Sequence, residues 1–289
     1  MLQHQIKLLD PQTLAPADEF VLIDDLSIHY QREGAGNGDP VLLIHGFGGW
    51  TKDWAKTIPV LAQQHEVYAL DLPGWGLSDK PADFDYSIEG QARFVIEFMN
   101  HFGLDRVKVV GNSMGGGISI FLATEFPERI EKLVLIDSVG YRHFPSQALV
   151  RRLVQLPIIE RVIHAFLPDF ARFRYKTRWL FGDADKVSLA DYQRHYLPLQ
   201  TPGTAAALMT MVQTLYLDSI RDRIEQVQQP TLILWGENDP FMPVEHAPLF
   251  HAAIENSQLT IFSDAGHVPQ AEVPDQMNPL LLEFLRDSN

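Results

Sequence analysis

The sequence of 289 residues contains no cysteine. This absence excludes a disulfide-stabilised fold, a thiolate nucleophile, and zinc or iron–sulfur sites built on cysteine ligands. A covalent nucleophile in this chain must therefore be a residue such as serine, threonine, lysine, aspartate or histidine.

Long hydrophobic runs are also absent. No stretch approaches the ~18 consecutive apolar residues of a membrane-spanning helix. The N-terminal segment lacks the basic stretch and the following apolar run of a secretory leader. We therefore expect a cytoplasmic protein without stable membrane insertion.

Basic side chains are few. The chain has 23 Lys and Arg against 37 Asp and Glu, which gives a formal net charge of −14. Because nucleic-acid binding needs a basic face, we expect no nucleic acid as a partner. Apolar residues make up 46% of the chain, which is enough at this length for a large buried core.

Short apolar runs alternate with longer amphipathic segments. A helix is predicted around Ile88–Met99, whose apolar residues recur on one helical face, and another around Met277–Phe284. Eight strands are predicted, at Phe20–Ile23, Ser27–Arg32, Val41–Ile44, Glu66–Leu70, Val107–Val110, Leu133–Ile136, Thr231–Trp235 and Leu259–Phe262. Continuous apolar strands that alternate with helices indicate an α/β fold with a parallel sheet covered on both faces.

One segment interrupts this alternation. Residues 138–206 lack buried strands and carry helical patterning interrupted by Pro145, Pro157, Pro168 and Pro198. We predict a helical cap inserted at 138–206, between a first part of the core at 1–137 and a second part at 207–289.

The segment Gly111–Gly115 has the pattern G-x-S-x-G between a predicted strand and a predicted helix. In that context the pattern predicts a nucleophile elbow, a tight turn that projects Ser113 above the carboxyl end of the sheet. The amino end of the following helix then stabilises negative charge that develops beside the serine. The alternative is a glycine-rich turn in which Ser113 only caps the helix.

A second glycine-rich loop, His45–Gly49, follows another predicted strand. Acyl transfer needs two donors aimed at the oxyanion, and we predict the backbone N–H groups of Met114 and Phe47 for this role. His45 is either a base or a brace that holds the loop by hydrogen bonding, and we favour the brace.

The predicted base is His267, which lies on a loop after a strand and before the C-terminal helix. Active-site groups of open α/β sheets collect at that edge. The predicted acid is Asp239, which would fix the imidazole tautomer and stabilise the imidazolium. The order Ser113, Asp239, His267 is the order expected for this architecture.

Three other acids compete for this role. Asp137 ends a predicted strand and is an alternative acid for the triad. Glu237 lies near Asp239 in sequence, but we expect it to shape the turn. Asp71 also follows a strand, and we expect it to anchor the loop Leu72–Asp79.

These motifs together resemble the α/β-hydrolase superfamily over nearly the whole chain. The resembling segments are His45–Gly49, Asp71–Ser78, Gly111–Gly116, Gly236–Asp239 and Gly266–His267. The resemblance implies an eight-stranded, mostly parallel sheet flanked by helices, a helical cap after the sixth strand, a Ser-Asp-His triad, and no cofactor or metal.

Within this superfamily, dehalogenases and epoxide hydrolases carry Asp at the elbow, so Ser113 argues against both. The elbow resembles carboxylesterases and lipases, and also hydrolases that cleave carbon–carbon bonds of aromatic ring-fission products. The latter usually have Trp after the histidine, where this chain has Val268. We therefore predict a serine esterase for short- to medium-chain apolar acyl esters. A C–C hydrolase is the alternative, and a non-catalytic ligand receptor is a further one.

The predicted cap is basic. The stretch Arg142–Arg178 has eight basic residues against two acids. It is either a lid that meets a lipid surface or an anionic substrate, or a solvated helix face, and we favour the solvated face. Phe144, Trp179, Phe181 and Met209 are candidates to line an acyl pocket, although core packing explains them equally well.

Overall fold

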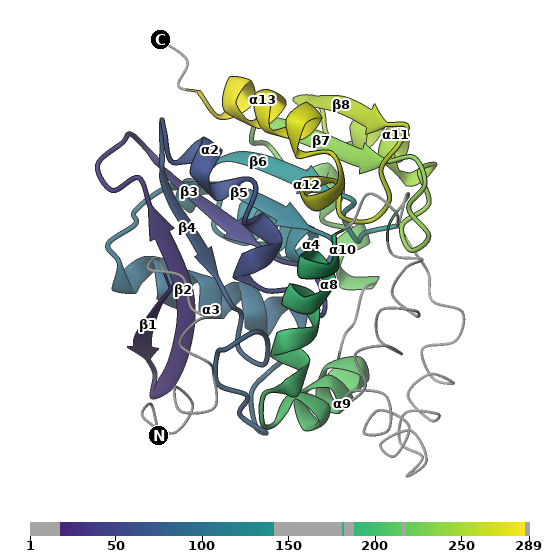
Figure 1. Cartoon of the computed structure of the whole chain (residues 1–289). Helices are drawn as coiled ribbons and strands as arrows, with labels where there is room; N and C mark the ends of the chain where they lie inside the picture. The colour runs from purple at the N-terminus through teal and green to yellow at the C-terminus, as the bar shows by residue number, and fades with distance from the viewer. Residues whose placement is uncertain (1–17, 142–180, 182–187, 215–217, 287–289) are drawn as a thin grey trace.

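The computed structural model describes residues 18–141, 181, 188–214 and 218–286. A single eight-stranded sheet forms its centre (Figure 1). The strands are β1 (Asp18–Ile23), β2 (Leu26–Glu33), β3 (Pro40–Ile44), β4 (Glu66–Leu70), β5 (Val107–Asn112), β6 (Ile130–Ile136), β7 (Thr231–Gly236) and β8 (Ser257–Phe262). All eight predicted strands are thus found, with ends moved by a few residues.

The order across the sheet is β1-β2-β4-β3-β5-β6-β7-β8. Strands β3 to β8 pair in parallel, whereas β2 pairs antiparallel with both β1 and β4. The sheet confirms the mostly parallel, eight-stranded arrangement that the resemblance implies. Because β3 and β5 to β8 run in the same direction, the loops after them meet at one edge of the sheet.

Helices and short 3-10 turns surround the sheet. The longer helices are α3 (Ile88–His101), α4 (Met114–Glu125), α8 (Leu189–Tyr196), α9 (Thr204–Thr214), α11 (His246–Ala253) and α13 (Pro274–Leu285). The short helices are α2 (Ile58–Leu61), α10 (Asp218–Arg221) and α12 (Pro269–Glu272), and the 3-10 turns are η2 (Thr51–Trp54), η3 (Pro127–Arg129), η5 (Leu197–Gln200) and η6 (Ile224–Gln226).

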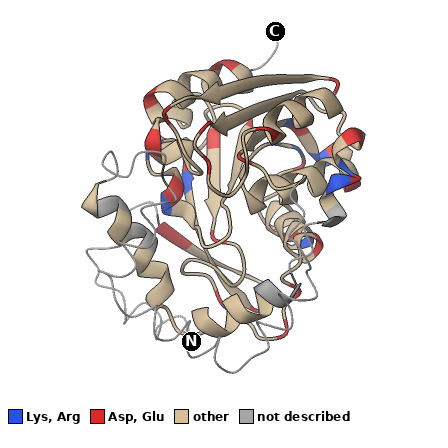
Figure 2. Cartoon of the chain, turned by 90° about the vertical axis from the view of Figure 1, so that its right-hand side faces the viewer, with Lys and Arg blue, Asp and Glu red and all other residues tan. Residues whose placement is uncertain are grey.

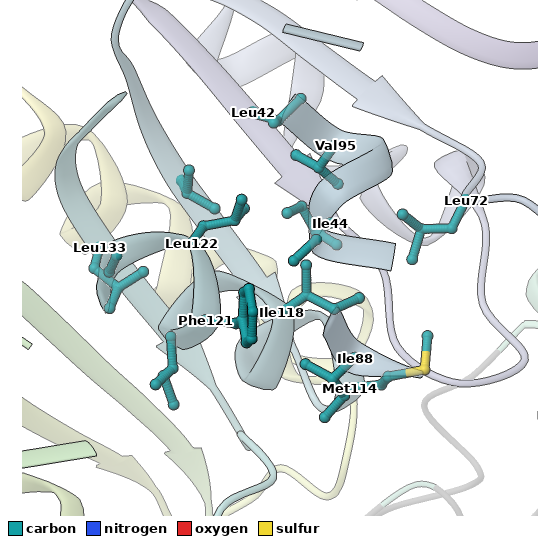
Figure 3. Close-up of a cluster of buried hydrophobic side chains, with 14 of the residues drawn as sticks. Leu42, Ile44, Leu72, Ile88, Val95, Met114, Ile118, Phe121, Leu122 and Leu133 are labelled. Carbon is teal, nitrogen blue, oxygen red and sulfur yellow. The ribbon is translucent and has the colours of Figure 1, made fainter. Parts of the chain in front are cut away.

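Two hydrophobic clusters lie on opposite faces of the sheet. Strand β3 shows how the sequence separates them, because Leu42 and Ile44 belong to one cluster while Val41 and Leu43 belong to the other. Figure 3 shows the first cluster, in which side chains of α3 and α4 pack against this strand. Helices α2 and α13 cover the other face. The sheet is therefore covered on both sides, which explains its continuous apolar strands.

Most of the predicted cap, including the basic stretch Arg142–Arg178, lies outside the described residues. The described part contains α8 and α9, and α9 runs across the boundary expected at residue 206. The division into core and cap stays a prediction. Figure 2 colours the positions of Asp and Glu red and those of Lys and Arg blue along the ribbon, and red segments occur on many of the described elements.

Candidate active site

Ser113 lies between β5 and α4, and its backbone has the φ and ψ angles 55° and −115°. A positive φ is rare for a residue with a side chain and costs about 1–3 kcal/mol. The surrounding structure holds this conformation, since Ser113 N–H donates to the carbonyl oxygen of Ile136 on the adjacent strand at 2.9 Å. This is the strained strand–turn–helix geometry that the G-x-S-x-G pattern predicts.

The glycines around Ser113 are required by close packing. A Cβ atom on Gly115 would lie 2.2 Å from the carbonyl oxygen of Ile44, and one on Gly111 would lie 2.3 Å from the carbonyl oxygen of Gly115. A Cβ on Gly46 would lie 3.0 Å from the Cβ of Ser113. The elbow and the loop after β3 are therefore direct neighbours.

The loop after β3 is braced by His45. Its Nδ1 lies 2.7 Å from the carbonyl oxygen of Gly46, and its Nε2 accepts the backbone N–H of Leu72 at 3.1 Å. Both ring nitrogens are thus engaged with the backbone, which supports a bracing role over that of a base. Phe47 is half exposed and packs edge-on against Trp75, with ring centroids 4.6 Å apart.

His267 and Asp239 form a close pair. Nδ1 of His267 lies 2.7 Å from Oδ2 of Asp239. The other oxygen of Asp239 accepts the backbone N–H groups of Phe241 at 2.7 Å and Met242 at 3.0 Å. Because the carboxylate accepts from Nδ1–H, the remaining ring nitrogen Nε2 carries the lone pair that takes up a proton.

The backbone of His267 is held on both sides. Glu272 accepts the N–H of Gly266 with its two oxygens at 3.1 and 3.0 Å, and the N–H of Val268 at 3.2 Å. Asn112 donates from Nδ2 to the carbonyl oxygen of His267 at 3.2 Å. Since Asn112 precedes Ser113, this bond ties the histidine loop to the elbow.

These supporting roles were not predicted from the sequence. Asn112 is a variable position of the elbow pattern, and Glu272 lies beyond the Gly266–His267 segment. Phe241 was also missed, although its ring lies 4.9 Å from that of His267. Their spacing from the triad residues is the sequence signal that could have indicated these roles. Phe241 follows Asp239 by two residues, and Glu272 follows His267 by five.

The competing acids occupy other positions. Glu237 is exposed. Asp71 is fully buried and accepts the N–H of Leu77 at 2.8 Å, which agrees with its predicted role as the anchor of that loop. Burial favours the neutral form of Asp71, but the nearby His29 holds the pKa of this carboxyl below its usual range.

Asp137 lies beside Asp239 at the end of β6. Its side chain is fully buried, and Oδ1 accepts the N–H of Gly236 at 2.9 Å. Burial, together with the negative charge of Asp239, raises the pKa of Asp137 well above its usual value. The residue whose carboxylate contacts His267 is therefore Asp239.

The candidate pocket residues are only partly described. Phe181 is buried, and its ring packs edge-on against Tyr192 at 5.4 Å. Met209 is half-buried on α9. Phe144 and Trp179 lie outside the described residues, so the pocket stays a prediction. Met114 is buried at the start of α4, where its backbone N–H belongs to the first turn.

No group of three or more His, Asp or Glu side chains among the described residues is arranged to hold a metal ion. No described helix combines the length and apolar character needed to cross a membrane.

Comparisons with known proteins agree with this fold. Residues 39–274 match the model of a family described as alpha/beta hydrolase fold. The dihydrolipoyllysine-residue acetyltransferase component of the acetoin cleaving system of Cupriavidus necator is 31% identical, over 94% of this chain and 70% of that protein. Lipase 1 of Psychrobacter immobilis is 30% identical, over 91% of this chain and 80% of the lipase. A meta-cleavage product hydrolase of Pseudomonas fluorescens is similar in structure, with a TM-score of 0.78, 26% identity, and coverage of 92% of this chain and 96% of that one.

Proposed function

Because the chain belongs to the α/β-hydrolase fold family, we propose that it is a serine hydrolase that cleaves carboxylic esters through an acyl-enzyme intermediate. The observation that carries this proposal is the 2.7 Å contact between His267 and Asp239, on a loop that Asn112 ties to the elbow of Ser113.

In the proposed mechanism, Nε2 of His267 takes the proton of the Ser113 hydroxyl as the oxygen attacks the ester carbonyl. Asp239 holds the ring and stabilises the imidazolium that forms. The imidazolium then protonates the leaving alcohol. Water enters, gives a proton to the same nitrogen and attacks the acyl carbonyl. The imidazolium returns that proton to Oγ of Ser113 as the carboxylic acid leaves.

The tetrahedral oxyanion is assigned to the backbone N–H groups of Met114 and Phe47. Met114 opens α4, so its N–H has no partner within the helix and is aimed by the strained elbow. Donors of this kind contribute about 3–4 kcal/mol each to transition-state stabilisation. A side-chain substitution does not remove a backbone N–H group. Ser113 is therefore the better residue to test.

Hydrolysis of carbon–carbon bonds is the second candidate. The likeness to a meta-cleavage product hydrolase favours it. The lipase relative and the valine at position 268 favour ester cleavage instead. Both reactions would use the same serine and histidine. A comparison of the two substrate classes is therefore needed to distinguish them.

The deciding experiment measures kcat/KM for p-nitrophenyl esters of increasing acyl length and for a vinylogous diketone from aromatic ring fission. We expect turnover of the short- to medium-chain esters, and its loss in Ser113→Ala. A higher kcat/KM for the diketone supports the C–C alternative. No turnover of either class, or activity retained by Ser113→Ala, contradicts the proposal and favours a ligand receptor or another nucleophile.

A further inference from the structure

Two aspartates that lie beside each other, Asp137 and Asp239, follow neighbouring parallel strands. Asp137 comes directly after β6, and Asp239 comes three residues after the end of β7. The side chain of Asp239 has no exposed surface, and Asp137 is equally buried. Their carboxyl groups lie within hydrogen-bonding reach of each other. Two carboxylates at such a distance do not both ionise easily in a site without water.

The backbone at Asp137 shows that the position is built for a short polar side chain. Its φ angle is 45°, and its N–H donates to the carbonyl oxygen of Leu234 on β7 at 3.0 Å. Aspartate and asparagine tolerate this left-handed region better than other residues with a side chain. The carboxyl group is therefore fixed between the ends of β6 and β7.

The hydrogen-bond donors in this region are distributed unequally among the three carboxyl groups of Asp137, Asp239 and Glu272. Asp239 receives hydrogen bonds from two backbone N–H groups and from His267. A third carboxylate, Glu272, receives the N–H groups of Gly266 and Val268. Among the described residues, Asp137 receives one donor, the N–H of Gly236 on Oδ1, and its buried Oδ2 has no donor. A single proton shared among these groups is therefore best placed on Oδ2 of Asp137, where it supplies the missing donor.

We propose that Asp137 is a positioning residue that carries a proton at neutral pH and donates it as a hydrogen bond from Oδ2 to the carboxylate of Asp239. The proton is not transferred, and no bond is made or broken. The hydrogen bond adds a fourth donor to Asp239 and fixes the carboxylate that orients His267. The consequence for catalysis rests on the proposed function.

Neutrality at position 137 also limits the negative charge beside His267. Asp239 and Glu272 both act on Asp137 as negative charges. A protonated Asp137 provides the hydrogen bond to Asp239 without adding a further negative charge to this cluster.

Asp137→Asn is the main test variant, because asparagine tolerates the positive φ and imitates the protonated acid. Its amide oxygen accepts the N–H of Gly236, and its Nδ2 donates to Asp239. Asp137→Gly also tolerates the backbone conformation but removes both bonds. Asp25→Asn is the matched control, since Asp25 has a φ of 63° and an exposed side chain in the turn between β1 and β2.

Infrared spectroscopy at pH 7 measures the protonation state of Asp137 and does not require enzymatic turnover. We expect the wild-type chain to show the C=O stretching band of a protonated carboxyl. The band should be absent from Asp137→Asn and from Asp137→Gly, and should persist in Asp25→Asn. A wild-type chain without the band, or a band that survives both substitutions at position 137, overturns the proposal. This result is independent of whether the chain hydrolyses esters.

The pH profile of kcat/KM tests the consequence for His267. We expect Asp137→Asn to keep kcat/KM within about twofold and its acidic limb in place, and Asp137→Gly to lower kcat about tenfold, as expected for a lost buried hydrogen bond. If Asp137 is instead ionised, Asp137→Asn removes a negative charge beside the proposed triad and moves the acidic limb of the profile to lower pH. That shift overturns the proposal, whereas a profile that stays in place supports it.

Discussion

Oδ2 of Asp239 lies 2.7 Å from Nδ1 of His267, although the two residues are 28 positions apart in the chain. The contact depends on two loops that leave adjacent parallel strands, β7 and β8, at the same edge of the sheet. It orients the imidazole so that Nε2 remains available for proton transfer.

Asp239→Asn should lower kcat by about 10³- to 10⁴-fold with little change in KM, because an amide at this position favours the wrong imidazole tautomer. Steady-state kinetics on the best p-nitrophenyl ester measures the effect. Glu237→Gln is the control, since it removes a negative charge from an exposed residue two positions away in the chain. Equal losses in the two variants would show that net charge, and not ring orientation, is responsible.

The support of the histidine backbone leads to a second prediction. Glu272→Gln should lower kcat about tenfold and leave KM almost unchanged. The amide has only one oxygen to accept from Gly266 and Val268, and its NH₂ group faces their N–H groups. The proposed role is in holding His267, so binding of the ground-state substrate should not depend on it.

Glu283→Gln on the exposed face of α13 is the matched control for this variant. It should keep wild-type kinetics. A Glu272→Gln variant with raised KM and unchanged kcat would place Glu272 in substrate binding and contradict the positioning role. Thermal unfolding of both variants shows whether the change is confined to the site.

These contacts mark the limit of what the sequence predicts. Strands such as β5 and β7 are predictable because their signal is local, a run of apolar residues bounded by turn residues. The elbow is predictable because its glycines lie next to Ser113 in sequence. Asp137 and Asp239 were both placed at strand ends, but choosing between them needs the packing of β6, β7 and the histidine loop. Hydrogen bonds of this kind depend on geometry that no local pattern contains.

The backbone of Ser113 gives a prediction about stability. Its φ of 55° strains a residue with a Cβ atom, whereas glycine adopts this conformation freely. Ser113→Gly should therefore be more stable than Ser113→Ala by about 1 kcal/mol. This is the ~1–3 kcal/mol of strain released, less the ~0.5–1 kcal/mol entropy cost of glycine.

Urea unfolding of the two variants measures this difference. Both lack the hydroxyl group, so the comparison isolates the backbone term from any loss of a hydrogen bond. If Ser113→Ala is as stable as Ser113→Gly, or more so, the elbow stores no strain. Activity should be absent from both variants, since neither provides a nucleophile.

A buried histidine makes the stability of the fold depend on pH. His29 is fully buried on β2, with Nδ1 at 2.7 Å from Asp71 and Nε2 at 3.3 Å from Asp18. Burial disfavours the charged ring, but the two carboxylates more than offset it and raise the pKa of His29 to about 9. Its pKa in the unfolded chain is about 6.5. The folded state therefore binds the proton more tightly than the unfolded state does.

The sign of the effect follows from this difference. The stabilisation from His29 is fully present below about pH 6.5 and is lost as the pH rises through about 9. We expect it to contribute about 2–3 kcal/mol to the free energy of unfolding at pH 6, and little above pH 9. Urea unfolding at pH 6, 7.5 and 9 should show that the free energy of unfolding of the wild-type chain falls by this amount relative to that of His29→Gln.

The control is His101→Gln, which changes an exposed histidine at the end of α3. Its free energy of unfolding should change with pH as that of the wild-type chain does. If the difference between wild type and His29→Gln does not change with pH, His29 is neutral in the folded protein, and the network around Asp71 is held by uncharged hydrogen bonds.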